Sequence, residues 1–353
     1  MAGSVTLKDI AQSAQVSVGT VSRVFNNHIN VTEEVRQRVL KAATQLGYFG
    51  AAGQEARPYE GSRIVKEIGF FFTTFIPNTV VGTNPFWSHI LHGVESEASK
   101  SNIKVTYRSL VEIQNTPDFL LTTIYEMKLG GILLVGPAGP ELVRLLQGVG
   151  IPLVLVDNYV PGTDAVLGDN FAGAREAVQH LIEMGHRQIA FIGGPMTAGT
   201  PPLNKIYTLE RRAEGYRMAL CDAGLPVSYD LYEDGGLFFE GGYEACRRLI
   251  ERGKPFSAIF CANDEMAIGA MKALREANLR VPEDVSLVGF DDIDIVEHLT
   301  PALTTVRVNK EVLGSITVKH LLSLMSNPNS VSVTNVLEVK LVKRNSVSRR
   351  SLQ

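Results

Sequence analysis

The chain has 353 residues, of which 45% are hydrophobic and 20% charged, and its formal net charge is −3 at pH 7. This ordinary globular composition excludes disordered, collagen-like and coiled-coil proteins. The sequence has neither an apolar run of about 18 residues nor an N-terminal signal segment, so we expect no membrane span and no export. The three cysteines form no CxxC pair, which favours reduced thiols in the cytoplasm and gives no structural zinc site.

The charge is distributed unevenly along the chain. Residues 1–50 contain five basic and three acidic residues, and the rest of the chain is net acidic. A mildly basic N-terminal segment is compatible with a module that binds phosphate, although a solvated surface alone would give the same balance.

Three short helices are predicted within residues 1–48. Thr6 and Asp9 have the spacing of a capping box at the start of the first helix, and Ser17 is a good N-cap for the second. Thr32 begins a third amphipathic segment. A three-residue turn between the first two helices is typical of a helix-turn-helix, although an ordinary helical hairpin would share the apolar spacing.

The remainder of the chain alternates between strand-like and helical patterns. Residues 49–62 are interrupted by glycine and proline and are predicted to be a hinge or linker. The later apolar runs indicate parallel strands buried on both faces and covered by helices. About 290 residues is large for one sheet, so we expect two doubly wound α/β lobes. The expected strands cover residues 64–72, 103–110, 130–136, 152–158, 188–194, 257–264 and 284–292.

Several motifs in this order resemble the lactose/galactose-repressor family of bacterial regulators. They are TLKDIA, VSVGTVSRVFN, RQRVLKAATQLGY, MGHRQIAFIGG, ANDEMAIGAM, VPEDVSLVGFDD and PALTTVRV. The resemblance covers about residues 5–345 and implies a DNA-binding head (1–48), a hinge (49–62) and a two-lobed core (63–353) like that of periplasmic sugar-binding proteins. We expect the first lobe to contain about 63–165 and 305–328, and the second about 166–304 and 329–345.

The second helix carries residue types that suit DNA recognition. Ser17, Thr20 and Ser22 can donate to phosphates, and Arg23 can bind guanine as a fork or contact a phosphate. The resemblance places a base-selecting pair at Val18 and Gly19, for which we expect contact with a thymine methyl group. The predicted DNA-binding set is Thr6, Ser17, Val18, Gly19, Thr20, Ser22, Arg23, Asn26, Asn30 and Arg57.

Two positions depart from the family pattern. The turn between the helices carries Gln15 where glycine is usual, at a cost of about 1 kcal/mol if that residue is left-handed. The hinge lacks the leucine that the family inserts into the minor groove, and ungapped counting puts Arg57 near that position. We expect either weaker DNA bending or an electrostatic role for Arg57 in a narrow minor groove.

Polar residues follow several predicted strands, where ligands bind in doubly wound sheets. Asp157, Asn263 and Asp291 end such strands, Thr73 follows another, and Arg212 lies on a helix. Together with the aromatic residues Phe86, Trp87 and Phe238, this set suits a polyhydroxylated ring. The resemblance implies effector contacts for Asp157, Arg212, Asn263 and Asp291. The structural alternatives are helix capping, loop anchoring and core packing, and Asp264 is predicted to be structural.

These patterns predict a ligand-responsive transcription repressor that binds a near-palindromic operator as a homodimer. We expect a sugar-like effector between the lobes, no cofactor, no metal and no membrane partner. An enzyme would need a nucleophile and base or a metal set, and the sequence shows neither. A plain solute-binding protein would not need the N-terminal helices, and an activator on the same fold stays open. The C-terminal end has no leucine heptad, so a dimer rather than a tetramer is expected.

Overall fold

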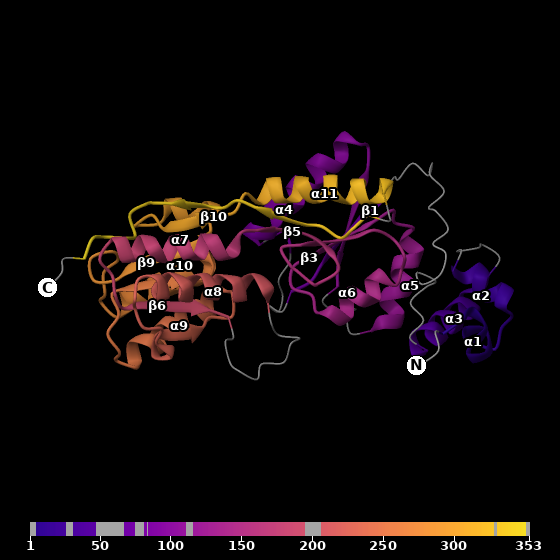
Figure 1. The fold of residues 1–353 in the computed structure, drawn as a ribbon, viewed down its shortest axis with the longest axis horizontal. Helices are drawn as coiled ribbons and strands as arrows, with labels where there is room; N and C mark the ends of the chain where they lie inside the picture. The colour runs from indigo at the N-terminus through magenta and orange to yellow at the C-terminus, as the bar shows by residue number, and fades with distance from the viewer. Residues whose placement is uncertain are drawn as a thin grey trace.

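The structure, a computed structural model, describes residues 5–25, 31–46, 67–74, 81–82, 84–110, 116–194, 206–327 and 330–350. It consists of a three-helix head and two α/β lobes with one six-stranded sheet each (Figure 1). None of the helices in these parts of the chain combines the length and hydropathy that a membrane span needs.

The head packs three helices around a small apolar cluster. Ile10, Val21 and Val39 are fully buried, one from each helix. The predicted helices are confirmed, and their bounds are α1 (Leu7–Ser13), α2 (Val18–Phe25) and α3 (Glu33–Gln45).

The first lobe has a parallel sheet in the order β11-β5-β4-β3-β1-β2. Its strands are β1 (Glu67–Phe72), β2 (Lys104–Ser109), β3 (Ile132–Val135), β4 (Leu153–Val156), β5 (Asp164–Gly168) and β11 (Thr334–Leu337). Its helices are α4 (Pro85–Lys100), α5 (Pro117–Met127), α6 (Pro140–Gln147) and α11 (Lys310–Ser326). Glycines allow α4 and α11 to approach closely, because a Cβ on Gly93 would lie 2.1 Å from the carbonyl oxygen of Glu311.

The second lobe repeats this arrangement in the order β12-β10-β9-β8-β6-β7, with β12 antiparallel to β10. Its strands are β6 (Ile189–Gly193), β7 (Tyr232–Asp234), β8 (Ala258–Cys261), β9 (Ser286–Asp291), β10 (Thr304–Arg307) and β12 (Lys340–Val342). Its helices are α7 (Asn170–Glu183), α8 (Tyr207–Asp222), α9 (Phe239–Glu251) and α10 (Asp264–Glu276), with the 3-10 turns η2 (Tyr229–Leu231) and η3 (Asp294–His298).

The strand pairing assigns several segments to a different lobe from the one that the sequence predicts. We expected residues from 305 onward in the first lobe, but β10 pairs with β9 in the second sheet, and buried Thr305 donates to Asp264 at 2.6 Å. We expected residues 329–345 in the second lobe, but β11 pairs with β5 in the first sheet. Residues up to Gly168 also belong to the first sheet. The chain therefore exchanges sheets after β5, after β10 and after β11.

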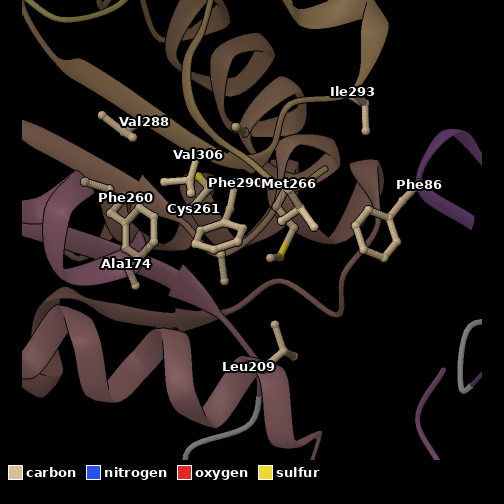
Figure 2. Packing of buried hydrophobic residues seen from close by; sticks show 14 of the residues in the cluster. Phe86, Ala174, Leu209, Phe260, Cys261, Met266, Val288, Phe290, Ile293 and Val306 are labelled. Atoms are coloured by element: carbon tan, nitrogen blue, oxygen red, sulfur yellow. The ribbon is translucent and has the colours of Figure 1, made fainter. Parts of the chain in front are cut away.

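The largest hydrophobic cluster extends across both lobes. Phe86 from α4 and Met266 and Phe290 from the second lobe are all less than a tenth exposed and belong to this one cluster. Figure 2 shows the Phe86 ring on the first-lobe side, facing Met266 and Phe290. This shared core places the strand ends of the two lobes opposite each other.

Both sheets have the same strand order, in which the first strand of each lobe lies between the second and the third. Such a reversal opens a crevice beyond the carboxyl ends of the strands. The described starts of α4, α8 and α10 and the residues at the carboxyl ends of β3, β4 and β9 therefore meet between the lobes.

Candidate functional site

The structure explains locally why α2 forms where the sequence predicts it. Ser17 is the N-cap, and its Oγ accepts a hydrogen bond from the backbone N–H of Thr20 at 3.0 Å. The same Oγ lies 2.9 Å from Thr20 Oγ1. Val21 and Val24 are buried against the head core, so the opposite face of α2 is available to a partner.

The turn between α1 and α2 has the left-handed residue that the sequence predicts. Gln15 has φ of 55°. The N–H of Gln15 donates to Gln12 at 3.3 Å, and the N–H of Val16 donates to Ala11 at 3.0 Å. This pair of bonds is a Schellman motif, which usually places glycine at the left-handed position.

The predicted DNA-reading residues fall into three groups. Ser17, Val18, Gly19 and Arg23 are exposed, and Thr20 and Ser22 are half-buried. Thr6 caps α1, with its backbone N and its Oγ1 both donating to Asp9 at 2.7 Å. The remaining predicted residues, Asn26, Asn30 and Arg57, lie outside the described residues.

A small cleft, partly open to solvent, lies between the two lobes. Its walls come from the loops and helix starts that follow the strand ends of both sheets. The lining residues are Asn84, Phe86, Trp87, Pro137 and Asp157 from the first lobe, and Ile206, Thr208, Leu209, Arg212, Leu237, Asn263, Glu265, Asp291 and Ile293 from the second.

Arg212 is the central cation of the cleft and is only 4% exposed. Its Nη2 lies 3.0 Å from Asp291 Oδ1, and its Nε donates to Asn170 Oδ1 at 2.7 Å. Its Nη1 donates to the carbonyl oxygen of Ala262, and its guanidinium carbon lies 3.9 Å from the centre of the Phe290 ring. This fixed guanidinium can present its outer edge to a ligand without reorganising.

Asp157 brings a second carboxylate into the cleft from the first lobe. The residue is 7% exposed and left-handed, with φ of 53°. Burial raises its pKa to about 7, with Arg212 opposing the rise and Asp291 adding to it. None of the hydrogen bonds of the described residues ends at its carboxylate, whose favourable electrostatic partner is Arg212. A ligand hydroxyl could supply the missing donor.

Asn263 is both a cleft residue and a helix cap. Its Oδ1 accepts from the backbone N–H of Met266 at 2.9 Å, and its Nδ2 donates to the carbonyl oxygen of Leu237 at 3.0 Å. Asp264 is fully buried and accepts from Ile293 N at 2.9 Å and from Thr305 Oγ1 at 2.6 Å. The structural role predicted for Asp264 is therefore what the structure shows.

Two of the predicted effector residues do not line the cleft. The Thr73 hydroxyl donates to two backbone carbonyls, that of Val135 at the end of β3 at 3.1 Å and that of Pro137 just after it at 2.8 Å. Phe238 precedes α9 and is half-buried outside the cleft lining. The other two predicted aromatic residues, Phe86 and Trp87, do line it, with ring centres 4.8 Å apart at 82°.

Sequence reasoning missed Asn84 and Glu265, which meet across the cleft. Asn84 Nδ2 donates to Glu265 Oε1 at 3.0 Å. Asn84 Oδ1 accepts from the backbone N–H groups of Phe86 and Trp87, at 3.0 and 3.1 Å, and so caps α4. The Asn-Pro pair at residues 84–85 is an N-cap signal that could have identified Asn84. No local pattern indicates that Glu265 faces it.

Two further contacts join the lobes. His89 Nε2 on α4 lies 3.1 Å from Asp294 Oδ2 on η3. The rings of Tyr159 and Tyr207 are 4.9 Å apart. Each of these contacts would change if the lobes rotated relative to each other.

Comparisons with known proteins agree with this geometry. Residues 6–50 match the family model of bacterial regulatory proteins of the lacI family, and residues 178–347 match that of the periplasmic binding protein-like domain. The chain is 31% identical to the "Probable HTH-type transcriptional repressor ExuR" of Bacillus subtilis, over 98% of this chain and 99% of the relative. It is 30% identical to the ribose operon repressor of Haemophilus influenzae, over 97% and 98%.

Two solved structures share the whole architecture. The complex of the transcriptional regulator CelR with cellobiose has a TM-score of 0.74 and 30% identity, covering 97% of this chain and all of that one. The lac repressor dimer bound to operator and the anti-inducer ONPF has a TM-score of 0.70 and 25% identity, covering 98% and 100%. With a helix-turn-helix head, two periplasmic-binding-protein-like lobes and relatives matched over almost their full length, this chain belongs to the lacI family of bacterial regulatory proteins.

Proposed function

We propose that this protein is a ligand-responsive transcription repressor. Two chains hold an operator through their head helices, and a small hydroxylated effector in the cleft between the lobes sets the affinity. The observation that carries this proposal is the cleft, where a buried guanidinium and several carboxylates lie opposite aromatic rings. Because the proposed target is chromosomal DNA, we place the protein in the cytoplasm.

In this proposal each cleft residue contacts a different part of a ring-shaped ligand. The outer edge of Arg212 donates to a hydroxyl oxygen, and Asp157 and Asp291 accept from hydroxyl groups. Trp87 and Phe86 cover an apolar face of the ring. Asn263 has both amide atoms engaged with the backbone, so its contribution is to hold Leu237 and the start of α10 in place.

The lobes are the proposed connection between effector and DNA. A ligand that touches both lobes changes the balance between arrangements that keep or break the contacts of Asn84 with Glu265 and His89 with Asp294. A coupling of about 1–3 kcal/mol between the two sites would change operator affinity about 5–150-fold.

On DNA, we propose that α2 enters the major groove. Arg23 reads a guanine, Val18 contacts a thymine methyl group, and Ser17 and Thr20 contact phosphates. Ser22, Asn26, Asn30 and Arg57 complete the proposed set, and Thr6 acts through the start of α1. A dimer presents two such helices to half-sites about one helical turn apart.

The test begins with selection of an operator from random duplexes by the purified full-length protein. Operator affinity is then measured by fluorescence anisotropy, alone and with a panel of neutral sugars, sugar acids, sugar phosphates and nucleosides. We expect at least one compound to change operator affinity at least fivefold, and Arg212→Gln to abolish that change.

Arg211→Ala is the matched control for this test, because Arg211 is the preceding residue on α8. It pairs with Glu214 and lies 4.8 Å from the centre of the Phe171 ring, outside the cleft lining. It should keep the response to the effector. Lack of preference for any duplex over random competitor would refute the proposal.

A further inference from the structure

The described lining residues of the cleft include more acidic groups than basic ones. Three carboxylates line it, those of Asp157, Glu265 and Asp291, together with one guanidinium, that of Arg212. Arg212 is already paired with Asp291 at 3.0 Å. The nearby Lys310 does not line the cleft: its Nζ donates to the backbone carbonyls of Asp291 at 2.9 Å and Asp292 at 2.8 Å, and its charge opposes the rise in the pKa of Asp291. No second cation lies among the described lining residues.

The orientation of Glu265 is fixed from the opposite lobe. The side-chain oxygen Oδ1 of Asn84 accepts hydrogen bonds from two backbone N–H groups at the start of α4, so the side-chain nitrogen Nδ2 has to face the cleft. There it donates to Glu265 Oε1 at 3.0 Å. One carboxylate oxygen of Glu265 is thereby held in place, and the other is left for a ligand or water.

Asp157 provides an independent observation that points to a ligand. Its side chain is more than nine-tenths buried and lines the same cleft. It accepts no hydrogen bond from the described part of the protein. A buried polar group without a partner is costly, so this carboxylate is placed to be satisfied from within the cleft.

We propose that Glu265, together with Asp157, is a specificity-determining residue that admits uncharged hydroxylated ligands and rejects ligands of similar size that carry a carboxylate or phosphate group. The inference rests on the proposed function, because it concerns the same cleft. Hydroxyl groups donate to carboxylates and need no counter-charge. A ligand anion would face at least two unbalanced carboxylates in a poorly hydrated space, where like charges repel strongly.

The pH dependence of this discrimination follows from the groups that face Glu265. They are Asn84 at the start of α4, Glu240 on α9 and Asp291 on β9, while Asp157 after β4 and Arg212 on α8 line the same cleft. Burial, Asp291 and Glu240 raise the pKa of Glu265 to about 7, against the opposing bond from Asn84. Because the pKa of Asp157 is also about 7, the rejection of anions should be strong at pH 8 and weaken towards pH 6.

The test uses matched probes that differ in charge: ribose with ribose 5-phosphate, glucose with glucose 6-phosphate and glucuronate, and cellobiose with cellobionate. Affinities for the full-length protein are measured by titration calorimetry at pH 8 and pH 6. The variants are Glu265→Gln, which keeps an acceptor for Asn84, and Asp157→Asn. Glu276→Gln at the far end of α10 is the control, because Glu276 lies outside the cleft and hydrogen-bonds to Tyr243.

We expect the wild type at pH 8 to bind no anionic probe as tightly as its neutral counterpart. Glu265→Gln should bind at least one anionic probe about tenfold more tightly than the wild type, with neutral probes changed less than threefold. Asp157→Asn should change in the same direction, and Glu276→Gln should match the wild type.

Two results would overturn the inference. One is an anionic probe that binds the wild type at pH 8 as tightly as its neutral partner does. The other is the absence of any gain for every anionic probe in both folded cleft variants. Either result leaves the proposed function standing if some ligand still changes operator affinity. Conversely, intact charge discrimination without any effect on the operator would refute the proposed function alone.

Discussion

The proposed DNA-recognition helix α2 and the cleft between the lobes differ in how their functional side chains are positioned. On α2, the exposed groups are positioned by contacts within a few residues, such as Ser17 with Thr20. In the cleft, Arg212 is positioned by Asn170, Ala262 and Asp291, which are 42 to 79 residues away along the chain. The surface of α2 therefore depends on residues that are close in sequence, and the cleft depends on how the two lobes assemble.

Because of this difference, substitutions on the two surfaces should differ in their effect on the stability of the protein. An exposed side chain on α2 can change without leaving a buried partner behind, so its loss should affect DNA binding alone. A charged group of the cleft has buried partners on several elements, so its loss should affect the free energy of unfolding as well as ligand binding. Substitutions on the two surfaces therefore test whether they are built differently.

The largest effect is expected for Arg212→Gln. The substitution leaves Asp291 buried without its cation and removes the contact with the Phe290 ring. Breaking a buried ion pair costs about 3–5 kcal/mol. We expect a fall of that size in the free energy of unfolding of the ligand-free protein, measured by urea denaturation at pH 8.

Arg211→Ala provides the comparison within the same helix. Arg211 is 38% exposed at its side chain and pairs with Glu214 on the surface, where such pairs contribute about 0–1 kcal/mol. Equal losses of stability for the two variants would mean that the buried network does not hold the cleft together.

Asp157→Asn should change stability in the opposite direction. Because burial raises the Asp157 pKa from 3.8 to about 7, the folded state binds the proton more tightly than the unfolded state does. The free energy of unfolding of the wild type should therefore fall as the pH rises from about 4 to 7 and change no further above that range. At pH 8 the variant should be more stable than the wild type by up to about 4 kcal/mol, since it lacks the buried charge.

The control for this variant is its pH dependence. The gain should shrink towards zero below about pH 3, where the wild-type carboxyl group is protonated in both states. Denaturation curves at four or five pH values measure it, and a gain that is constant with pH would show that the charge is not its source.

The same contrast explains what the sequence could predict. The three helices of the head and seven strands of the lobes follow from apolar spacing and from caps such as Ser17, which are local signals. The left-handed Gln15 was also predictable, because the turn requires that conformation. Five strands were missed: β5, β7, β10, β11 and β12. They are short, and β10 is half threonine, so no apolar run marks them.

The cleft could be predicted only in part. Asp157, Arg212, Asn263 and Asp291 do line it, because polar residues at strand ends meet at one edge of a sheet. Thr73 also follows a strand, but its hydroxyl turns to the backbone of the neighbouring strand's loop. Glu265 faces Asn84, 181 residues earlier in the chain, and only the packing of one lobe on the other brings them together.

On the reading helix, Arg23→Lys should weaken DNA recognition without affecting stability. Lysine keeps the charge but cannot form the bidentate hydrogen bond that a guanidinium makes with guanine. We therefore expect about 1–3 kcal/mol less discrimination at one base pair. Anisotropy measurements on the selected operator and on single-base variants give this value. Urea denaturation should agree with the wild type to about 0.5 kcal/mol.

If Arg23 contacts only a phosphate, the lysine variant will keep full base discrimination, and Arg23→Ala will weaken all duplexes equally. That outcome would remove Arg23 from the base-reading set and leave Val18 as the sole proposed contact to a base edge on the described part of α2.

The smallest effect is expected for Gln15→Gly, which tests the local character of the head. Glycine adopts a φ of 55° without the steric cost that glutamine bears, so the variant should stabilise the head by about 0.5–1 kcal/mol. Amide hydrogen exchange of α1 and α2 in the full-length chain would report slower opening. Gln12→Gly, inside α1 at a right-handed position, should have the opposite sign and cost about 1 kcal/mol. If both variants destabilise the head, packing between the helices fixes the turn. The conformation of the head would then depend less on short-range hydrogen bonds than the structure indicates.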